Sequence, residues 1–344
     1  MSKEENNKYI YTPLPEPIPI TEQEWPDDVL PLVHTRTMAF NHENFIRECI
    51  EGLLMQKTTF PVQILIHDDA STDNTAAIIK EYEEKYPRLI KAYYQEENSY
   101  SKSRQNKKRL RKTYFSWTVG KYEAMCEGDD YWIDPLKLQK QVRFLEENPE
   151  YVLACGGYKS VNVYTNQEEV IIKKKRKRSN EMEGFEFGLD EMKKQWLTKT
   201  LTVVYRHSAL KYYPSKKYQH GRDIHLFYHL LKVGKGYYFS SIMGGYHIHK
   251  GGINSMQPDK INFSISCKIY RELYDNNKDD YTRQRNIISS VNMFKYNIFN
   301  ENNTSLLENI KIFMYAISLI KSVGDLKIII SLLLKKNKSS QYSD

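Results

Sequence analysis

Short apolar runs alternate along the chain with longer segments of mixed polarity. Five of these runs have the length and composition of buried strands. In the segments between them, apolar residues recur at the three- and four-residue spacing of amphipathic helices. The pattern predicts strands at 32–40, 62–67, 89–94, 122–126 and 151–155.

Capping residues indicate where the intervening helices begin. Asn41 is expected to cap the first helix, the Ser71-Thr72-Asp73 segment to open the second, and Pro135 to start a third. Strands that alternate with helices form a largely parallel sheet covered by helices on both faces. The sequence therefore predicts an α/β fold around a mostly parallel central sheet.

The two ends of the chain have different patterns. Six prolines between Thr12 and Pro31 forbid helix and predict an extended arm laid over the surface. Near the other end, 310–323 and 326–334 predict two helices separated by a break at Gly324-Asp325. Their wide apolar faces, flanked by lysines, must be covered by the rest of the chain, by a second subunit or by an anionic membrane surface. These three alternatives stay open.

Polar residues follow several of the predicted strands. Phe40-Asn41 follow the first strand, Asp68-Asp69 the second, and the segment 127–130 (Glu-Gly-Asp-Asp) the fourth. Ligands of such sheets bind beyond the carboxyl ends of the strands. Acidic residues suit a divalent cation that bridges to phosphate, or the hydroxyl and N–H groups of a nucleoside. Because the glycine-rich phosphate motifs GxGxxG and GxxxxGK[ST] are absent from the sequence, a nucleotide site of the carboxylate-plus-metal type remains.

Three segments carry a resemblance to a known family. They are MAFNHENFIRECIEGLLMQ, ILIHDDASTDNTAAIIKEYEEKYP and YEAMCEGDDYWIDPLKLQKQVRFLEENPEY, in this order. Together they resemble the family-2 glycosyltransferases of the GT-A fold, of the type that builds bacterial surface polysaccharide. The resemblance implies transfer of a sugar from a nucleotide diphosphate donor, with inversion at the anomeric carbon, and a divalent metal, Mn²⁺ or Mg²⁺.

The resemblance also implies a division of the chain. Residues 1–31 would form the proline-rich arm, 32–252 the GT-A catalytic domain and 253–344 a helical region. Within the catalytic domain, 32–156 would bind the nucleotide and 157–252 the acceptor. A helical C-terminal extension is therefore expected beyond the GT-A fold.

Several residues match positions that bind the nucleotide in the family. The resemblance implies that Asp69 accepts the N3–H of uracil, which makes UDP-sugar the expected donor, and that Phe40 stacks on the base. An ordinary core position is the alternative for Phe40, and a turn or helix cap is the alternative for the two aspartates. Further residues expected at the nucleotide are Asn41, Asp68, Lys102, Arg104 and Glu127.

The metal, the base and the acceptor are assigned in the same way. Asp129 and Asp130 are the expected metal ligands, with the choice between them open, and His249 would complete the site. Asp223 matches the catalytic base that deprotonates the acceptor hydroxyl, with a helix cap as its structural alternative. His247 stands where the family more often has arginine, and Trp132 is expected either to stack on the acceptor sugar or to fill the core.

Composition and charge limit the other possibilities. The chain has 344 residues, 51 Lys plus Arg against 43 Asp plus Glu, and a net charge of +8, which suits anionic ligands. Four cysteines without a CxxC pair, and an N-terminus without an apolar run, predict a reduced, cytoplasmic protein, at most at the inner face of the membrane. The basic run 173–178 lacks interleaved aromatics, so we expect anionic glycan or lipid near it and no nucleic acid.

Two other functions are alternatives to glycosyl transfer. A nucleotidyltransferase that makes sugar nucleotides would need a glycine-rich loop after the first strand, and the sequence lacks one. A non-catalytic glycan-binding protein on the same fold would not need Asp129, Asp130 and Asp223 together. The expected partners are therefore a nucleotide-sugar donor and a glycan or lipid-linked glycan acceptor, with membrane contact or homo-oligomer formation open.

Overall fold

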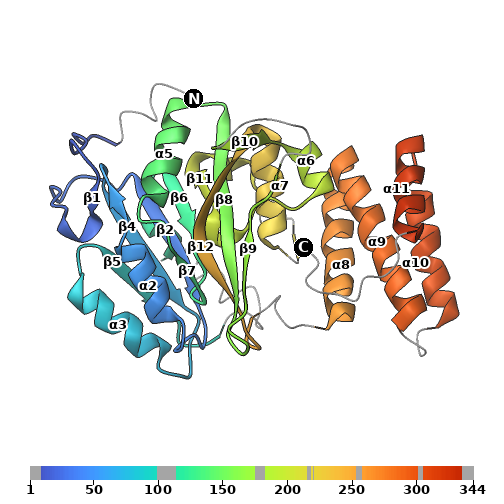
Figure 1. Cartoon of the computed structure of the whole chain (residues 1–344), viewed down its shortest axis with the longest axis horizontal. Helices are drawn as coiled ribbons and strands as arrows, with labels where there is room; N and C mark the ends of the chain where they lie inside the picture. Colours follow the sequence, from blue (N-terminus) through green and yellow to red (C-terminus); the bar gives the residue numbers. More distant parts are fainter. Residues whose placement is uncertain are drawn as a thin grey trace. The chain divides into compact units, whose positions relative to one another are not determined.

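The chain forms two compact units in the computed structural model, which describes residues 9–98, 114–174, 183–214, 218–219, 221–252, 258–300 and 305–334 (Figure 1). Unit 1 consists of Met1–Phe187, Leu197–Tyr212 and Val233–Ile248, and it holds the sheet. Unit 2 consists of Gly188–Trp196, Tyr213–Lys232 and His249–Asp344, and it is helical.

Four of the five strands predicted from the sequence form the parallel half of the sheet in unit 1, and the fifth, at 151–155, is the start of β8 in the other half. Strand β2 lies between β4 and β6, β5 lies beyond β4, and all of these pairings are parallel. The bounds of the strands are Val33–Ala39 for β2, Val62–Asp68 for β4, Ile90–Tyr94 for β5 and Tyr122–Met125 for β6. The predicted α/β class and parallel core are confirmed.

The other half of the sheet is mixed, so the sheet as a whole is less parallel than the sequence pattern indicates. Strand β11 runs antiparallel to both β6 and β8, and β12 runs parallel to β8. Strands β7 and β10 pair antiparallel with β12, and β9 pairs antiparallel with β8. The bounds are Asp130–Trp132 for β7, Tyr151–Asn162 for β8, Glu168–Ile171 for β9, Gly184–Phe187 for β10, Val204–Arg206 for β11 and Lys235–Ile248 for β12.

Three helices of unit 1 pack their apolar faces on the sheet: α2 (Ile46–Leu54), α3 (Thr75–Lys85) and α5 (Lys137–Glu147). The prediction that Asn41 caps α2 is wrong, because the helix begins five residues later at Ile46. Asn41 instead has a left-handed backbone with φ of 55° and belongs to the preceding turn. Asparagine tolerates this conformation as well as a cap position, so its presence alone did not decide between them.

The described part of the proline-rich arm is largely extended, but it includes a short 3-10 helix, Ile20–Glu22, that the prolines were expected to exclude. Strand β1 (Ile18–Pro19) pairs antiparallel with β3 (Lys57–Thr58), and the backbone N–H of Leu14 donates to Thr59 O at 3.0 Å. Ile20, in the short 3-10 helix that follows, is 4% exposed and joins the core of unit 1. The arm is thus part of the fold of unit 1.

Unit 2 contains the remaining α-helices of the described residues. Helices α8 and α9 pack together, and α10 and α11 each pack on α9. Ala316, Leu319 and Ile329 are buried in one cluster with Ile287 and Val291 of α9. The bounds are Leu189–Lys194 for α6, Asp223–Val233 for α7, Asp259–Asn277 for α8, Asp280–Asn300 for α9, Leu306–Ser318 for α10 and Val323–Leu334 for α11.

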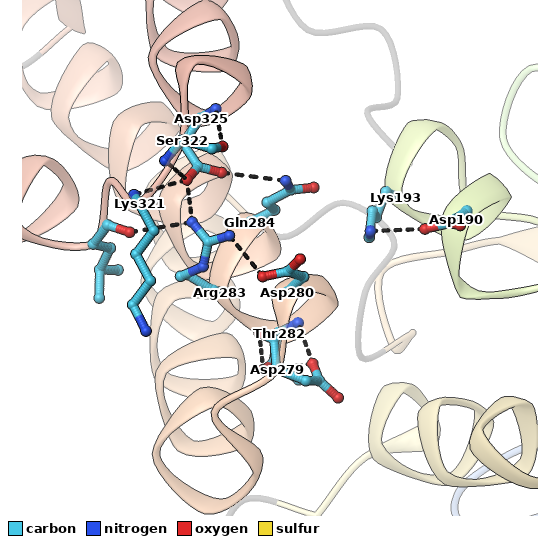
Figure 2. Close-up of polar contacts among 11 residues, drawn as sticks. Asp190, Lys193, Asp279, Asp280, Thr282, Arg283, Gln284, Lys321, Ser322 and Asp325 are labelled. Atoms are coloured by element: carbon cyan, nitrogen blue, oxygen red, sulfur yellow. Dashed lines mark hydrogen bonds and ion pairs between the residues drawn. The ribbon is translucent and has the colours of Figure 1, made fainter.

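The break between α10 and α11 lies earlier than the sequence predicts. It spans 319–322, whereas Gly324 and Asp325 belong to the first turn of α11. The Asp325 carboxylate accepts the backbone N–H groups of Lys321 at 2.9 Å and Ser322 at 3.0 Å, and it is ion-paired with Arg283 of α9 (Figure 2). Because the Asp325 carboxylate is fully buried and joins the backbone before α11 to Arg283, the corner is fixed to α9.

The outer sides of these two helices carry exposed apolar residues. On α10 these are Leu306, Leu307, Ile310, Met314 and Ile317, and on α11 they are Val323, Leu326, Ile330, Leu333 and Leu334. Packing on α9 therefore covers only part of the predicted apolar face. Among the described helices, none has the length and apolar character needed to cross a bilayer.

Candidate active site

The carboxyl ends of β2, β4 and β6 lie next to one another, and the loops that follow them are hydrogen-bonded together. The backbone N–H of Asn41 donates to Ser71 Oγ at 3.0 Å, and Asn41 Oδ1 accepts the Thr72 N–H at 2.8 Å. The backbone N–H of Gly128 donates to Met38 O at 2.8 Å. The structure therefore brings the three predicted segments together, with Asn41 joining two of the loops.

Phe40 follows β2 and is 42% exposed. This excludes the alternative of an ordinary core phenylalanine. The ring is available to a ligand at the edge of the sheet, as base stacking would require, and that role stays a prediction.

The two aspartates after β4 have different surroundings. Asp68 is 2% exposed, and it accepts the Ser71 N–H at 3.0 Å and the Ser71 hydroxyl at 2.5 Å. Burial raises the pKa of Asp68 although these hydrogen bonds favour its charged form. Asp68 thus has the contacts of a residue that closes the turn, which was the structural alternative for it.

Asp69 is half-buried, and its backbone N–H donates to Ala39 O at 2.9 Å. Its Oδ1 accepts a hydrogen bond from the Gln95 side chain, and its backbone O accepts one from Asn98 Nδ2 at 3.2 Å. The carboxylate is therefore held at the edge of the sheet by residues that follow β5. This geometry agrees with the nucleotide role expected for Asp69 without testing it.

The acidic loop after β6 is held tightly against β2. Glycine is needed in this loop because a Cβ at Gly128 would lie 2.9 Å from His42 Nδ1 and 3.0 Å from Met38 O. Glu127 and Asp129, on either side of it, are half-buried. The loop therefore presents these two carboxylates from a fixed backbone.

Asp129 and Asp130 are not equivalent. The Asp130 side chain is 4% exposed, and its Oδ1 accepts the His247 backbone N–H at 3.3 Å. Burial, together with the charge of Asp129, raises the pKa of Asp130 well above its usual value, whereas the positive charge of Lys199 lowers it. The Asp129 side chain is 17% exposed and lies 3.8 Å from His42 Nε2. Asp129 is therefore the more accessible of the two carboxylates.

Two histidines at this loop were not assigned to the site from the sequence. His247 Nδ1 lies 2.7 Å from Asp129 O, which can only accept, so this nitrogen carries a proton. The His247 ring packs near the rings of Phe45 and Tyr131, with centroid distances of 5.0 and 4.9 Å. From the sequence, His247 was aligned with the family only by resemblance, and His42 was not predicted at all. The contacts of these two histidines with Asp129 depend on how β2 and β12 approach the loop in the folded protein.

Trp132 does not lie where an acceptor sugar could stack on it. The side chain is 2% exposed, and its indole N–H donates to Leu201 O at 2.8 Å. The acceptor-binding assignment is therefore wrong, and the core alternative is correct. The aromatic residue beside it, Tyr131, is half-buried next to His247.

Asp223 and His249 belong to unit 2 and are described within that unit. Asp223 is the first residue of α7, and its Oδ1 accepts the Ile224 N–H at 2.9 Å. Its carboxylate is half-buried. His249 directly follows β12 and is 5% exposed. The roles of both residues stay predictions.

The predicted basic contacts lie largely outside the described residues. Lys102 and Arg104 both fall there, as does most of the run 173–178.

The acidic loop has the donor set of a divalent-cation site. Its donors are hard carboxylate oxygens, which Mg²⁺ and Mn²⁺ prefer. Burial is the main reason that the pKa of Asp130 is raised, and the neighbouring charges of Asp129 and Glu127 raise it further. A cation bound there would relieve this repulsion. The residues present therefore fit the metal implied by the sequence, with Asp129 as the accessible ligand.

A second cluster of metal-capable side chains lies away from this loop. His34 Nε2 and His207 Nδ1 are 3.2 and 3.4 Å from Glu123 Oε2. However, His34 Nδ1 accepts the Gly120 N–H at 3.1 Å, so the proton of the neutral ring is on Nε2, where a metal would have to bind. Arg36 already pairs with Glu123 at 3.0 Å. The cluster is a buried hydrogen-bond and charge network.

The sheet and its acidic edge are those of the GT-A fold. A profile of the family described as "Glycosyl transferase family 2" matches residues 37–211, about half of the chain. The chain therefore belongs to glycosyltransferase family 2 and is a glycosyltransferase.

Individual proteins agree with this assignment. The chain is 44% identical over 114 residues to the Mycobacterium bovis protein Mb1547, an alignment that covers 33% of this chain and 31% of that protein. It is 31% identical over 115 residues to the Escherichia coli UDP-Glc:α-D-GlcNAc-diphosphoundecaprenol β-1,3-glucosyltransferase WfaP, covering 33% and 41%. The chain thus spans less than half the length of these curated relatives.

A solved structure supports the fold over a longer stretch. The structure of S. aureus TarS 1-349 in complex with UDP-GlcNAc has a TM-score of 0.53 to this chain and 17% identity, covering 86% of this chain and 81% of that one. At this identity the likeness concerns the fold alone.

Proposed function

We propose that the protein transfers a sugar from a UDP-sugar to a hydroxyl group of a glycan or a lipid-linked glycan, with inversion at the anomeric carbon, in the synthesis of a surface polysaccharide. The observation that carries the proposal is the joining of the loops after β2, β4 and β6, which present Phe40, Asp69 and Asp129 at one edge of the sheet. Family membership and the UDP-GlcNAc complex of TarS support it.

The nucleotide would lie across the ends of β2 and β4. Asp69 would accept the N3–H of uracil, and the exposed Phe40 ring would cover one face of the base. A carboxylate that is already fixed by hydrogen bonds loses little freedom when the base binds. This end of the site thus supplies binding energy and base selectivity.

The metal would be held by Asp129, and the hydrogen bond between Asp130 and the His247 N–H would hold the loop in place. Bound Mn²⁺ or Mg²⁺ would neutralise charge that develops on the departing diphosphate. His247 donates to the backbone O of Asp129 and its backbone N–H donates to Asp130, so β12 keeps both residues in place. Glu127, at the start of the loop, would reach a ribose hydroxyl.

Asp223 would act as the general base. The acceptor hydroxyl must lose a proton as its oxygen attacks the anomeric carbon, and a half-buried carboxylate at the start of α7 can take it. The carboxylate is oriented by the Ile224 N–H. His249 is proposed to complete the metal or diphosphate site.

The outer sides of α10 and α11 suit an anionic membrane surface. Their exposed apolar residues are accompanied by exposed Lys311, Lys321 and Lys327, while Glu308 is the one exposed carboxylate on the described part of α10 and α11. A second copy of the chain would bring like charges together, whereas anionic lipid would attract them. The diphosphoundecaprenol acceptor named for WfaP gives such attachment a use. We accordingly place the enzyme at the cytoplasmic face.

The donor can be tested with a panel of nucleotide sugars. Ligands that bind the native state raise its melting temperature by mass action. We expect UDP-sugars with Mn²⁺ to raise it, and CDP-sugars, whose base has an acceptor in place of the N3–H, to raise it less. A panel in which no UDP compound stabilises the protein would contradict the proposed donor.

A further inference from the structure

Gln95 directly follows β5 and contacts the residue proposed to read the base. Its backbone N–H donates to Asp68 O at 2.9 Å, which fixes the start of its side chain beside the end of β4. Its side-chain nitrogen, Nε2, donates to Asp69 Oδ1 and lies 2.8 Å from His67 Nε2. One amide nitrogen thus joins a buried histidine to the Asp69 carboxylate.

The chemistry of these contacts fixes the position of each proton. His67 Nδ1 lies 3.3 Å from the sulfur of Met38, which has no proton to give. The His67 proton therefore belongs on Nδ1, and Nε2 is left as an acceptor for Gln95. The second N–H of the same amide then points to Asp69. The opposite amide orientation would place an oxygen against the carboxylate, so only this arrangement satisfies every contact.

The histidine that anchors this chain of contacts is itself held rigidly. His67 is 0% exposed, and the rings of Tyr93 and Tyr114 lie 5.7 and 5.6 Å from its ring, measured between centroids. Burial lowers the pKa of His67 to about 4, so its ring is neutral near pH 7 and keeps its acceptor nitrogen. The orientation of Gln95 is therefore set by the core of the protein.

We propose that Gln95 is a positioning residue for base selectivity, which holds Asp69 in the orientation that accepts the imide N–H of a uracil base. The proposal rests on the proposed UDP-sugar donor. Because Gln95 acts through Asp69, it should affect the recognition of one atom of the base and leave the rest of the nucleotide site unchanged. A role in folding alone would not discriminate between bases.

The test compares ligands that differ at that atom. The affinities of UDP, N3-methyl-UDP and CDP are measured by isothermal titration with Mn²⁺, for the wild type, Gln95→Met and the control Lys91→Met. Methionine keeps the volume of glutamine and removes its N–H donors. Lys91 is an exposed residue of the same strand. N3-methyl-UDP lacks the imide proton, and CDP presents an acceptor at N3.

We expect the wild type and Lys91→Met to prefer UDP over N3-methyl-UDP by at least about tenfold. In Gln95→Met this preference should fall below about threefold, because UDP binding weakens while N3-methyl-UDP binding changes little. Wild-type preference in Gln95→Met would overturn the inference alone. The inference would also be overturned if Gln95→Met bound all three ligands more weakly by the same factor while its melting temperature equalled that of the wild type.

Two further outcomes are distinguishable. A wild type that does not bind UDP, or that binds UDP and N3-methyl-UDP equally, contradicts the proposed function and the inference together. If Gln95→Met does not fold, Gln95→Asn, which withdraws the amide by one methylene, is judged by the same criteria.

Discussion

Asp223 is the residue on which turnover should depend most selectively. Its carboxylate is half-buried at the first position of α7 and accepts one backbone N–H. Asparagine can accept the same hydrogen bond but cannot take a proton. We predict that Asp223→Asn binds UDP-sugar as the wild type does and turns over 10²–10⁴-fold more slowly, roughly the usual contribution of a general base. Steady-state kinetics and donor titration together check this, and retained turnover would assign the base to another carboxylate.

Single residues were predictable where a motif places them and unpredictable where tertiary contacts do. Asp69 and Asp129 could be singled out because they follow strands whose ends must meet. His42 and Gln95 also follow predicted strands, but no motif singles them out, and His247 reaches the same edge from β12, which is distant in sequence. Trp132 was ambiguous for the same reason, since only packing shows that its indole lies in the core.

At the scale of elements, α5 begins with an unusual residue. Lys137 is its first residue and is 0% exposed, and its Nζ lies 4.0 Å from the Trp132 ring centroid without a hydrogen-bond partner among the described residues. Burial lowers the pKa of Lys137 to about 7. The positive end of the helix dipole also disfavours a cation there.

This geometry predicts a pH-dependent stability. In the unfolded chain Lys137 keeps its proton up to about pH 10.4, whereas the folded protein releases it above about pH 7. Between these values the unfolded state binds more protons, so the free energy of unfolding rises with pH. We predict that Lys137→Met is more stable than the wild type at pH 7, and that this advantage shrinks by up to about 1.4 kcal/mol per pH unit toward pH 10.

Urea unfolding at several pH values measures this difference. Glu169→Gln, an exposed change on β9, is the control for effects of the titration itself. If the variant is less stable than the wild type at pH 7, or its advantage does not depend on pH, Lys137 is held as a cation on the Trp132 ring and the account of this helix start is wrong.

The elements themselves were largely predictable because hydrophobic periodicity reflects burial. The parallel strands and the helices between them follow the pattern of apolar positions. The helix ends were less predictable. Asn41 and Gly324-Asp325 each suit two local structures, and the choice was made by contacts with Thr72 in one case and with Arg283 in the other.

At the scale of the whole molecule, the exposed apolar sides of α10 and α11 are proposed to bind anionic membrane. We predict that Leu326→Glu with Ile330→Glu, both 46% exposed, abolishes flotation with vesicles containing phosphatidylglycerol. Each exposed lysine would contribute about 1 kcal/mol to such binding, so high salt should weaken it. Gln167→Glu, an exposed change in unit 1, is the control.

Light scattering tests the alternative that a second copy of the chain covers the outer sides of α10 and α11. A wild type that does not float but has the mass of a dimer, with the double variant monomeric, would show that these helices form a subunit contact. A monomeric wild type that does not float contradicts both. The sequence pattern could not choose between these outcomes, because an apolar face indicates only that something covers it.

The central claim is that a metal held by Asp129 at the edge of the sheet binds the diphosphate of UDP. It is tested most directly by isothermal titration of UDP into the wild type, Asp129→Asn and Asp130→Asn, each with Mn²⁺ and with EDTA. We predict that EDTA weakens the binding of UDP to the wild type at least about tenfold. Asp129→Asn with Mn²⁺ should bind UDP as weakly as the wild type does with EDTA. Asp130→Asn should still bind UDP more tightly with Mn²⁺ than with EDTA, because its amide oxygen can accept the His247 N–H. Equal wild-type affinity with Mn²⁺ and with EDTA would contradict the account.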